Sequence, residues 1–90
     1  MFRFLAAAVL VAVAYSPAVA GPTCTSEPKT AWMAESAMKA KIDALGYKTT
    51  VFKTTSGNCY EIYGFDSGGA RVEVYFHPIT GDIVSAYRKS

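Results

Sequence analysis

The sequence has little histidine, little cysteine and no large excess of charge of one sign, and each shortage narrows the functions open to it. Its 90 residues include one His, two Cys, nine Lys or Arg and seven Asp or Glu, which gives a net charge of +2. A nucleic-acid-binding surface needs clustered basic residues, which this balanced chain lacks. A Ser-His-Asp or Cys-His system would have to use His77, and no partner pattern supports that use. We therefore expect no enzymatic activity and no binding of nucleic acid.

Sites for metals and phosphates are also poorly supported. Two thiols and one imidazole make a poor zinc site. Asp66 and Asp82 could in principle gather a cation with His77, but single residues near different turns usually serve only to solubilise loops. The segment Ser67-Gly68-Gly69 lacks the following helix and the Lys-Ser/Thr pair of a phosphate-binding loop. The sequence therefore predicts no metal site and no cofactor.

The first 20 residues differ in kind from the rest of the chain. Arg3 supplies a positive charge, residues 4–15 form an apolar run, and the segment ends in Ala-Val-Ala, which fits the small-x-small cleavage rule. A membrane anchor would need about 20 apolar residues, which is more than this run offers. We predict a signal peptide over residues 1–20, cleaved after Ala20. The mature protein would then be periplasmic or secreted, without a stable membrane anchor.

Export changes the interpretation of the two cysteines, Cys24 and Cys59. In an oxidising compartment an even pair outside a CxxC motif is more often a disulfide than a metal site or a redox catalyst. Closing a loop of this length removes about 3.8 kcal/mol of denatured-state entropy in the loop model. The core of so small a domain rarely supplies more than about 3–5 kcal/mol. We expect a disulfide between the two cysteines on which folding depends.

The mature chain begins with residues 21–30, an extended leader with two prolines that Cys24 would hold to the domain. From about Ala31 to Leu45, apolar residues recur at three- and four-residue steps, which is the period of one helix face. Gly46 supplies the left-handed position that ends a helix. The sequence therefore predicts a helix over 31–45, with Ala34, Ala37, Met38, Ile42 and Leu45 on its apolar face.

Everything after Gly46 is typical of strands and turns. Four segments rich in β-branched and aromatic residues are separated by short turns containing Gly, Asn or Pro. These connections are too short for the crossovers of a parallel sheet. We therefore predict an α+β fold with one N-terminal helix packed on a four-stranded antiparallel meander sheet. The predicted strands are 47–54, 59–66, 71–76 and 82–88.

The alternation of residues predicts which side chains face the helix. The third strand alternates most cleanly, so its two valines and Phe76 should form the helix-facing core. On the second strand Tyr60 and Ile62 should share that face, which leaves Gly64 at a core position without a side chain. A β-bulge at Gly64 would turn Phe65 inward, and we predict that bulge.

Several motifs follow one another in a distinctive order. They are Trp32, the helix end Leu45-Gly46-Tyr47, the strand segments 59–66 and 71–76, and the turn Pro78-Ile79-Thr80-Gly81. In this order they resemble the PepSY domain, and the nearest likeness is to its small, stand-alone secreted members. The resemblance covers roughly residues 32–83, and we assign residues 31–90 to a PepSY-like domain. The family usually has Asp before its Pro-x-Thr-Gly turn, where this sequence has His77.

The resemblance implies a non-enzymatic role. PepSY domains occur in propeptides of thermolysin-type metallopeptidases and in membrane regulators, and the family is proposed to inhibit or locally control proteases outside the cytoplasm. This chain would then be an exported binding domain that inhibits or locally regulates an extracytoplasmic protease. The resemblance brings no set of inhibitory residues to this sequence.

A candidate partner surface is formed by Tyr63, Tyr75 and Tyr87, which are predicted to lie on the sheet face away from the helix. Tyrosine often anchors interfaces, so the domain could dock on a protease or another envelope protein through this face of the sheet, or through an edge strand. The alternative is that the leader, drawn across by Cys59, covers the stripe. A second function class is a periplasmic small-ligand or ion-binding protein, which would need a concave pocket with converging polar groups.

Overall fold

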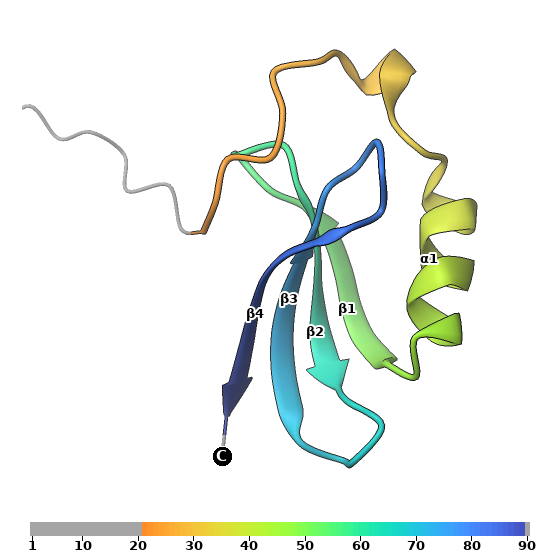
Figure 1. The fold of residues 1–90 in the computed structure, drawn as a ribbon, viewed down its shortest axis with the longest axis vertical. Helices are drawn as coiled ribbons and strands as arrows, with labels where there is room; N and C mark the ends of the chain where they lie inside the picture. Colours follow the sequence, from red (N-terminus) through yellow and green to blue (C-terminus); the bar gives the residue numbers. More distant parts are fainter. Residues whose placement is uncertain (1–20, 90) are drawn as a thin grey trace, which may run out of the picture.

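The computed structural model describes residues 21–89 as two layers, a four-stranded sheet with one α-helix against one face (Figure 1). The strands pair in the order β1-β2-β3-β4, and every pair is antiparallel, so the predicted α+β fold with a meander sheet is confirmed. The predicted signal peptide and its cleavage after Ala20 fall outside the described residues. The elements are η1 (Lys29–Ala31), α1 (Glu35–Ala44), β1 (Lys48–Thr54), β2 (Tyr60–Phe65), β3 (Arg71–Phe76) and β4 (Ile83–Lys89).

The helix begins later than predicted and is not N-terminal, because residues 21–34 precede it in the described chain. Trp32 has an extended backbone with ψ of 152°, and the Met33 N–H donates to the Pro78 carbonyl at 2.8 Å. This stretch is therefore held to the β3–β4 turn, and only the short 3-10 turn η1 forms before it. The predicted start was wrong. The predicted end is confirmed by Gly46, which follows the helix with φ of +92°.

The core lies between α1 and the central strands. Met38 and Ile42, one helical turn apart, are fully buried against the sheet. The ring of Tyr60 contacts those of Trp32 and Phe52 at centroid distances of 5.5 and 5.1 Å, which closes one end of the core. The side chains predicted to face the helix from β2 and β3 are all buried: Tyr60, Ile62, Val72, Val74 and Phe76.

The bulge predicted at Gly64 was wrong, because β2 pairs with β3 in unbroken register and Phe65 stands opposite Arg71. The irregularity lies instead on the other side of Gly64, in β1 between Thr49 and Val51. A Cβ atom at Gly64 would collide with the backbone of Lys48. The glycine therefore serves the close approach of the β1 and β2 backbones next to the irregularity in β1.

Candidate binding surfaces

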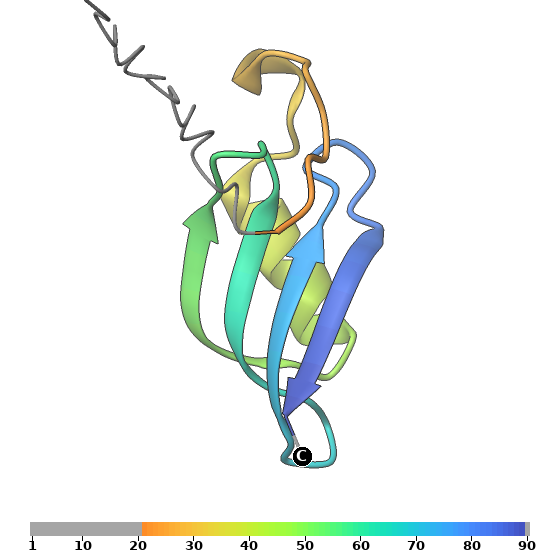
Figure 2. The same ribbon diagram turned by 90° about the vertical axis from the view of Figure 1, so that its left-hand side faces the viewer.

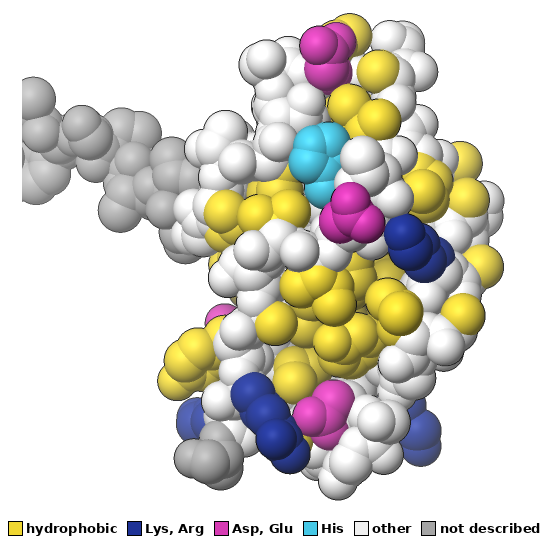
Figure 3. Space-filling view, viewed as in Figure 1, with side chains coloured by type: hydrophobic (Ala, Val, Ile, Leu, Met, Phe, Trp, Pro, Cys, Tyr) yellow, Lys and Arg dark blue, Asp and Glu magenta, His cyan; other side chains and the backbone are white. Residues whose placement is uncertain are grey.

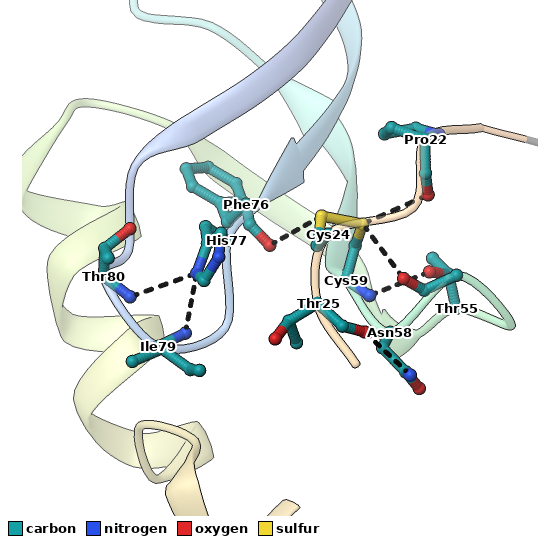
Figure 4. Close-up of a disulfide and its surroundings, with 11 residues drawn as sticks. Pro22, Cys24, Thr25, Thr55, Asn58, Cys59, Phe76, His77, Ile79 and Thr80 are labelled. Carbon is teal, nitrogen blue, oxygen red and sulfur yellow. Dashed lines mark hydrogen bonds between the residues drawn. A yellow bond between two sulfur atoms is a disulfide. The ribbon is translucent and has the colours of Figure 1, made fainter. Parts of the chain in front are cut away.

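The predicted disulfide between Cys24 and Cys59 is present, with the two Cα atoms 5.2 Å apart (Figure 4). It joins the leader to the residue that precedes β2. The Cys24 N–H donates to the Gly57 carbonyl at 2.8 Å, and the Asn58 side-chain amide donates to the Thr25 carbonyl at 3.0 Å. The leader is thus attached to the β1–β2 turn, at one end of the sheet.

His77 organises the turn that leads into β4. Its Nδ1 accepts the backbone N–H groups of Ile79 at 3.2 Å and Thr80 at 3.3 Å (Figure 4). Its backbone N–H donates to the Asp82 carbonyl, and its carbonyl accepts the Gly81 N–H, both at 2.8 Å. An Asp or Asn side chain accepts bonds of this kind in many turns. The imidazole nitrogen of His77 therefore accepts the backbone hydrogen bonds that a carboxylate accepts in other turns.

The tyrosines predicted as a partner surface share the outer face of the sheet, which is the face away from α1. Tyr63 and Tyr87 stand on either side of Glu73 in the strand register, and Tyr87 is 61% exposed. Tyr75 lies against the leader, because a side chain at Gly21 would run into its ring. The leader crosses the outer face only at the ends of β2 and β3 that lie near the disulfide (Figure 2). Charge and the leader thus interrupt the stripe, and its binding of a partner stays a prediction.

Glu61 forms the base of a small hollow on the outer face. Its side chain is buried, and its Oε1 atom lies 3.3 Å from the Lys53 ammonium group. Lys53 in turn donates to the Tyr63 hydroxyl at 2.7 Å. The Glu61 Oε2 atom is buried and, among the described residues, has no hydrogen-bond partner. We call this hollow of about 210 Å³ the Glu61 pocket; its lining is Lys53, Thr54, Thr55, Ser56, Glu61, Tyr63 and Tyr75.

Two side chains of the Glu61 pocket, Lys53 and Tyr75, have raised pKa values. The Glu61 carboxylate stands opposite Tyr75 in the register of β2 and β3, within hydrogen-bonding reach of its hydroxyl. That hydrogen bond raises the pKa of Tyr75 to about 12, with burial as the second cause. The Tyr63 hydroxyl, more than Glu61, raises the pKa of Lys53. The pocket therefore contains an ammonium group and a neutral phenol over a wide range of pH.

The second candidate surface is the outer edge of β4. All seven residues of this strand are exposed, and no described strand pairs with its far side. Ile83 and Val84 are 45% and 44% exposed. The register of β3 and β4 skips Val84, because Ser85 pairs with Tyr75 and Ile83 with Phe76. This edge therefore combines unpaired backbone groups with apolar side chains.

Helix α1 contributes to the same surface. The Lys41 ammonium group donates to the Thr80 carbonyl at 3.1 Å, so this side of the helix faces the β3–β4 turn. Leu45 follows Lys41 by four residues and lies on the same side, where it is 50% exposed. Viewed from the β4 edge, hydrophobic side chains gather between β4 and α1 (Figure 3). We call the free edge of β4 together with Ile83, Val84 and Leu45 the β4 edge surface.

The other end of β4 is basic. Arg71, Arg88 and Lys89 line an open hollow of about 590 Å³ beside the β2–β3 turn. Arg88 also lies 3.2 Å from the carboxylate of Asp66, which neutralises part of this charge. The β4 edge is thus apolar where the strand begins and positive where it ends.

The sequence pattern did not identify Glu61, and it suggested docking by an edge strand without identifying β4. For Glu61 a signal was present, because Glu-x-Tyr occurs in both the second and the third strand, at 61–63 and 73–75. Antiparallel pairing of these two triplets places each Glu opposite a Tyr. For β4 the sequence contains the apolar pair Ile83-Val84. Whether such a pair is exposed depends on the position of α1, which the sequence pattern does not give.

Two features are absent from the described residues. Within residues 21–89, no three His, Cys, Asp or Glu side chains are placed so that they could share a metal ion. No helix in this part of the chain has the length and apolarity that a membrane crossing requires.

Comparison with known proteins gave one positive result. A family model described as the peptidase propeptide and YPEB domain matches residues 3–87. The comparisons with curated proteins and with solved structures gave no match.

Proposed function

The chain belongs to the family of peptidase propeptide and YPEB (PepSY) domains, and from this premise we propose that it is an exported binding domain that regulates a peptidase outside the cytoplasm. Domains of this family are in general propeptide-like and non-catalytic. The proposal accordingly gives this chain no bond-making or bond-breaking step. The domain acts by occupying a surface of the peptidase.

The β4 edge surface is the observation that carries this proposal. A strand with a free edge can pair with an extended segment of a partner, in which backbone hydrogen bonds give affinity and side-chain contacts give specificity. Ile83 and Val84 belong to that strand and are 45% and 44% exposed, so an added segment would cover apolar surface there. Burial of such apolar side chains contributes about 25 cal/mol for each Å² removed from water.

The charge along β4 supports a specific chemistry for the partner segment. At the start of the strand, Ile83 and Val84 favour apolar side chains. At its end, Arg71 and Lys89 favour a carboxylate, because opposite charges lower the free energy of association and speed the encounter. We therefore expect the peptidase to present an extended segment with apolar residues at one end and an acidic residue at the other.

The Cys24–Cys59 disulfide supports the proposed location. Disulfides persist in oxidising compartments such as the periplasm and the extracellular medium, and they are rare in the cytosol. Together with the signal peptide predicted over residues 1–20, the disulfide supports a location that the domain would share with exported peptidases.

The test is a titration of peptidase activity. The disulfide-bonded protein is added to the fractionated exported peptidases of the producing cell, and cleavage of a fluorogenic peptide is followed. We expect a saturable change in the activity of one peptidase. Val84→Lys should weaken this effect by about tenfold or more, since a charge placed in an apolar contact costs at least 1.4 kcal/mol of binding free energy.

Val51→Lys is the matched control. Val51 lies on the opposite edge strand, β1, and is 43% exposed, against 44% for Val84. This variant should retain binding within about twofold of the original protein. Equal losses in both variants would remove the β4 edge from the proposal. Absence of any effect on every exported peptidase would remove the proposed function itself.

A further inference from the structure

We propose that the outer face of the sheet binds a free amino acid with an apolar side chain, in a hollow that Arg71 and Glu73 share. Figure 2 looks onto this face, with α1 behind the sheet. Of the lining residues, only Arg71 also lines the basic hollow at the end of β4. We call this second hollow, of about 360 Å³, the Arg71–Glu73 hollow; its lining is Thr50, Val51, Tyr63, Gly64, Phe65, Arg71 and Glu73.

The first argument is a pair of opposite charges without ion-pair partners. Arg71 and Glu73 are exposed and alternate with the buried Val72, so both stand on the outer face of β3. Within residues 21–89 neither side chain takes part in an ion pair, with the other or with a third group. Residues two positions apart on a strand lie about 6–7 Å apart. The charged groups of a small ligand can therefore enter between the two side chains.

An amino acid carries both complementary charges on groups that share one carbon atom. Its carboxylate can bond the Arg71 guanidinium, which presents paired N–H donors, and its ammonium group can bond the Glu73 carboxylate. A ligand with only one of these charges would meet one attracting and one repelling group in the same hollow. The pair therefore favours a ligand that is both a cation and an anion.

The second argument is the apolar wall of the hollow. Each charged residue stands opposite an aromatic one in the register of β2 and β3: Phe65 opposite Arg71, and Tyr63 opposite Glu73. The Arg71 guanidinium lies 6.0 Å from the centroid of the Phe65 ring, within the range of cation–π attraction. Val51 pairs with Tyr63 from β1 and is 43% exposed. An apolar side chain would therefore find contacts directly beside the two charges.

The third argument is that the irregularity in β1 contributes to the hollow. The register pairs Thr49 with Gly64 and Val51 with Tyr63, so Thr50 is an extra residue. The Thr50 hydroxyl donates to the Tyr63 carbonyl at 2.9 Å, and Thr50 lines the hollow. Bulges of this kind bend a strand and are over-represented at sheet edges and next to active sites. The hollow therefore depends on the course of the backbone as well as on side chains.

The position and the size of the hollow fit one amino acid. The leader crosses the outer face near the disulfide, whereas the hollow lies toward the other end of the sheet, where Phe65 ends β2 and Arg71 begins β3 (Figure 2). Pockets for small molecules usually measure about 300–1,000 Å³. At about 360 Å³ the hollow is at the lower end of this range, and a free amino acid is among the smallest ligands of such pockets.

The test is a two-dimensional ¹H–¹⁵N NMR titration of the full disulfide-bonded chain with L-phenylalanine and three analogues. N-acetyl-L-phenylalanine lacks the ammonium charge, L-phenylalanine amide lacks the carboxylate, and glycine lacks the apolar side chain. We expect L-phenylalanine to cause saturable shifts of the amides around Val51, Phe65 and Glu73. Each analogue should bind about tenfold more weakly or worse, since each loses a charged hydrogen bond or a buried side chain. No saturable shift with L-phenylalanine, or an analogue that binds as tightly, would overturn the proposal.

Two variants assign the two charges. Glu73→Gln should weaken binding of L-phenylalanine by about tenfold and remove its advantage over N-acetyl-L-phenylalanine. Arg71→Gln should cause a similar loss and remove the advantage over L-phenylalanine amide. Lys89→Gln is the matched control, because Lys89 stands opposite Arg71 in the register but does not line the hollow. It should keep the affinity within about twofold. An unchanged affinity in either charge variant, or an equal loss in Lys89→Gln, contradicts the proposal.

The outcome is separable from that of the proposed function. Arg71 and Glu73 are exposed, so their replacement should leave the fold intact, which thermal unfolding checks. If one variant does not fold, the three analogues on the original protein carry the test. The peptidase titration with Val84→Lys and Val51→Lys uses no amino-acid ligand. Amino-acid binding and peptidase regulation can therefore fail independently.

Discussion

The two edge strands of this sheet have the same length and opposite chemistry. β1 carries Lys48 and Lys53, and the Thr50 hydroxyl donates to the Tyr63 carbonyl beside the bulge in the strand. Natural edge strands are protected from pairing with other chains by such charges and bulges. β4 has its basic residues at one end only, and its other end is apolar at Ile83 and Val84.

This difference indicates which edge is available to a partner. Both edges are exposed, so exposure alone does not separate them. The lysines do, because β1 carries one near each end, whereas the first five residues of β4 carry no charge. Both strands contain a register irregularity, so that feature does not separate them. The paired variants Val84→Lys and Val51→Lys test this contrast directly, since the two valines are almost equally exposed.

The largest expected effect concerns the disulfide, which joins the leader to the start of β2, next to the edge strand β1. Replacing Cys24 and Cys59 by serine should lower the free energy of unfolding by about 3.8 kcal/mol, because the open chain regains the entropy that a loop of this size loses. Urea unfolding followed by far-UV circular dichroism measures the change. Reduction of the original protein is the control and should give the same loss. A loss below about 1 kcal/mol would mean that the leader contributes little.

The next effect concerns the attachment of β1. Gly64→Ala would push a methyl group into the backbone of Lys48, and we expect it to cost about 1–3 kcal/mol of stability. Gly68→Ala is the control, because a Cβ there meets only the Asp66 carboxylate at 3.4 Å. That variant should stay within about 0.5 kcal/mol of the original protein. Equal costs in thermal unfolding would show that β1 is not held by the close approach at Gly64.

The smallest effect is read from the row that links both edges, which runs from Lys53 in β1 through Glu61 and Tyr75 to Ser85 in β4. Glu61 raises the pKa of Tyr75 from 10.0 to about 12, so this pairing favours the folded state below pH 10. The contribution should disappear as the pH rises from about 10 to 12. In Glu61→Gln the pKa of Tyr75 should return toward 10.0, as measured by the tyrosinate absorbance at 295 nm.

An unchanged titration curve in Glu61→Gln would contradict this account of the row. Tyr75→Phe identifies which transition in the curve belongs to Tyr75.

The fold was predictable because the sequence patterns that specify it involve residues close together in the chain. Alternation in the third strand and short turns between strands specify a meander without knowledge of distant contacts. The disulfide followed from the cysteine count and the expected compartment. The helix start was not predictable in this way, since the Met33 N–H bonds Pro78, which lies 45 positions later in the chain. No local pattern contains that contact.

The error at Gly64 has a similar cause. A glycine at a core position suggests either a bulge or a close backbone approach, and sequence alone does not separate the two. The close approach of the Lys48 backbone decides between them, and that contact comes from a different strand.

The candidate sites were only partly predictable. Placing Tyr63 and Tyr75 on the outer face followed from alternation. The burial of Glu61 did not, because it depends on side chains from three strands. The β4 edge surface also required the position of α1, which leaves Leu45 50% and Ile83 45% exposed.

The position of the disulfide has a consequence for a protein that meets peptidases. The loop between Cys24 and Cys59 contains the whole of α1 and β1. If a peptidase cut the chain once anywhere in that loop, the two fragments would remain covalently joined, and α1 could stay packed on the sheet. Such a nicked molecule would migrate as one species on a non-reducing gel and as two after reduction. A domain built this way can be cleaved at one bond without being taken apart.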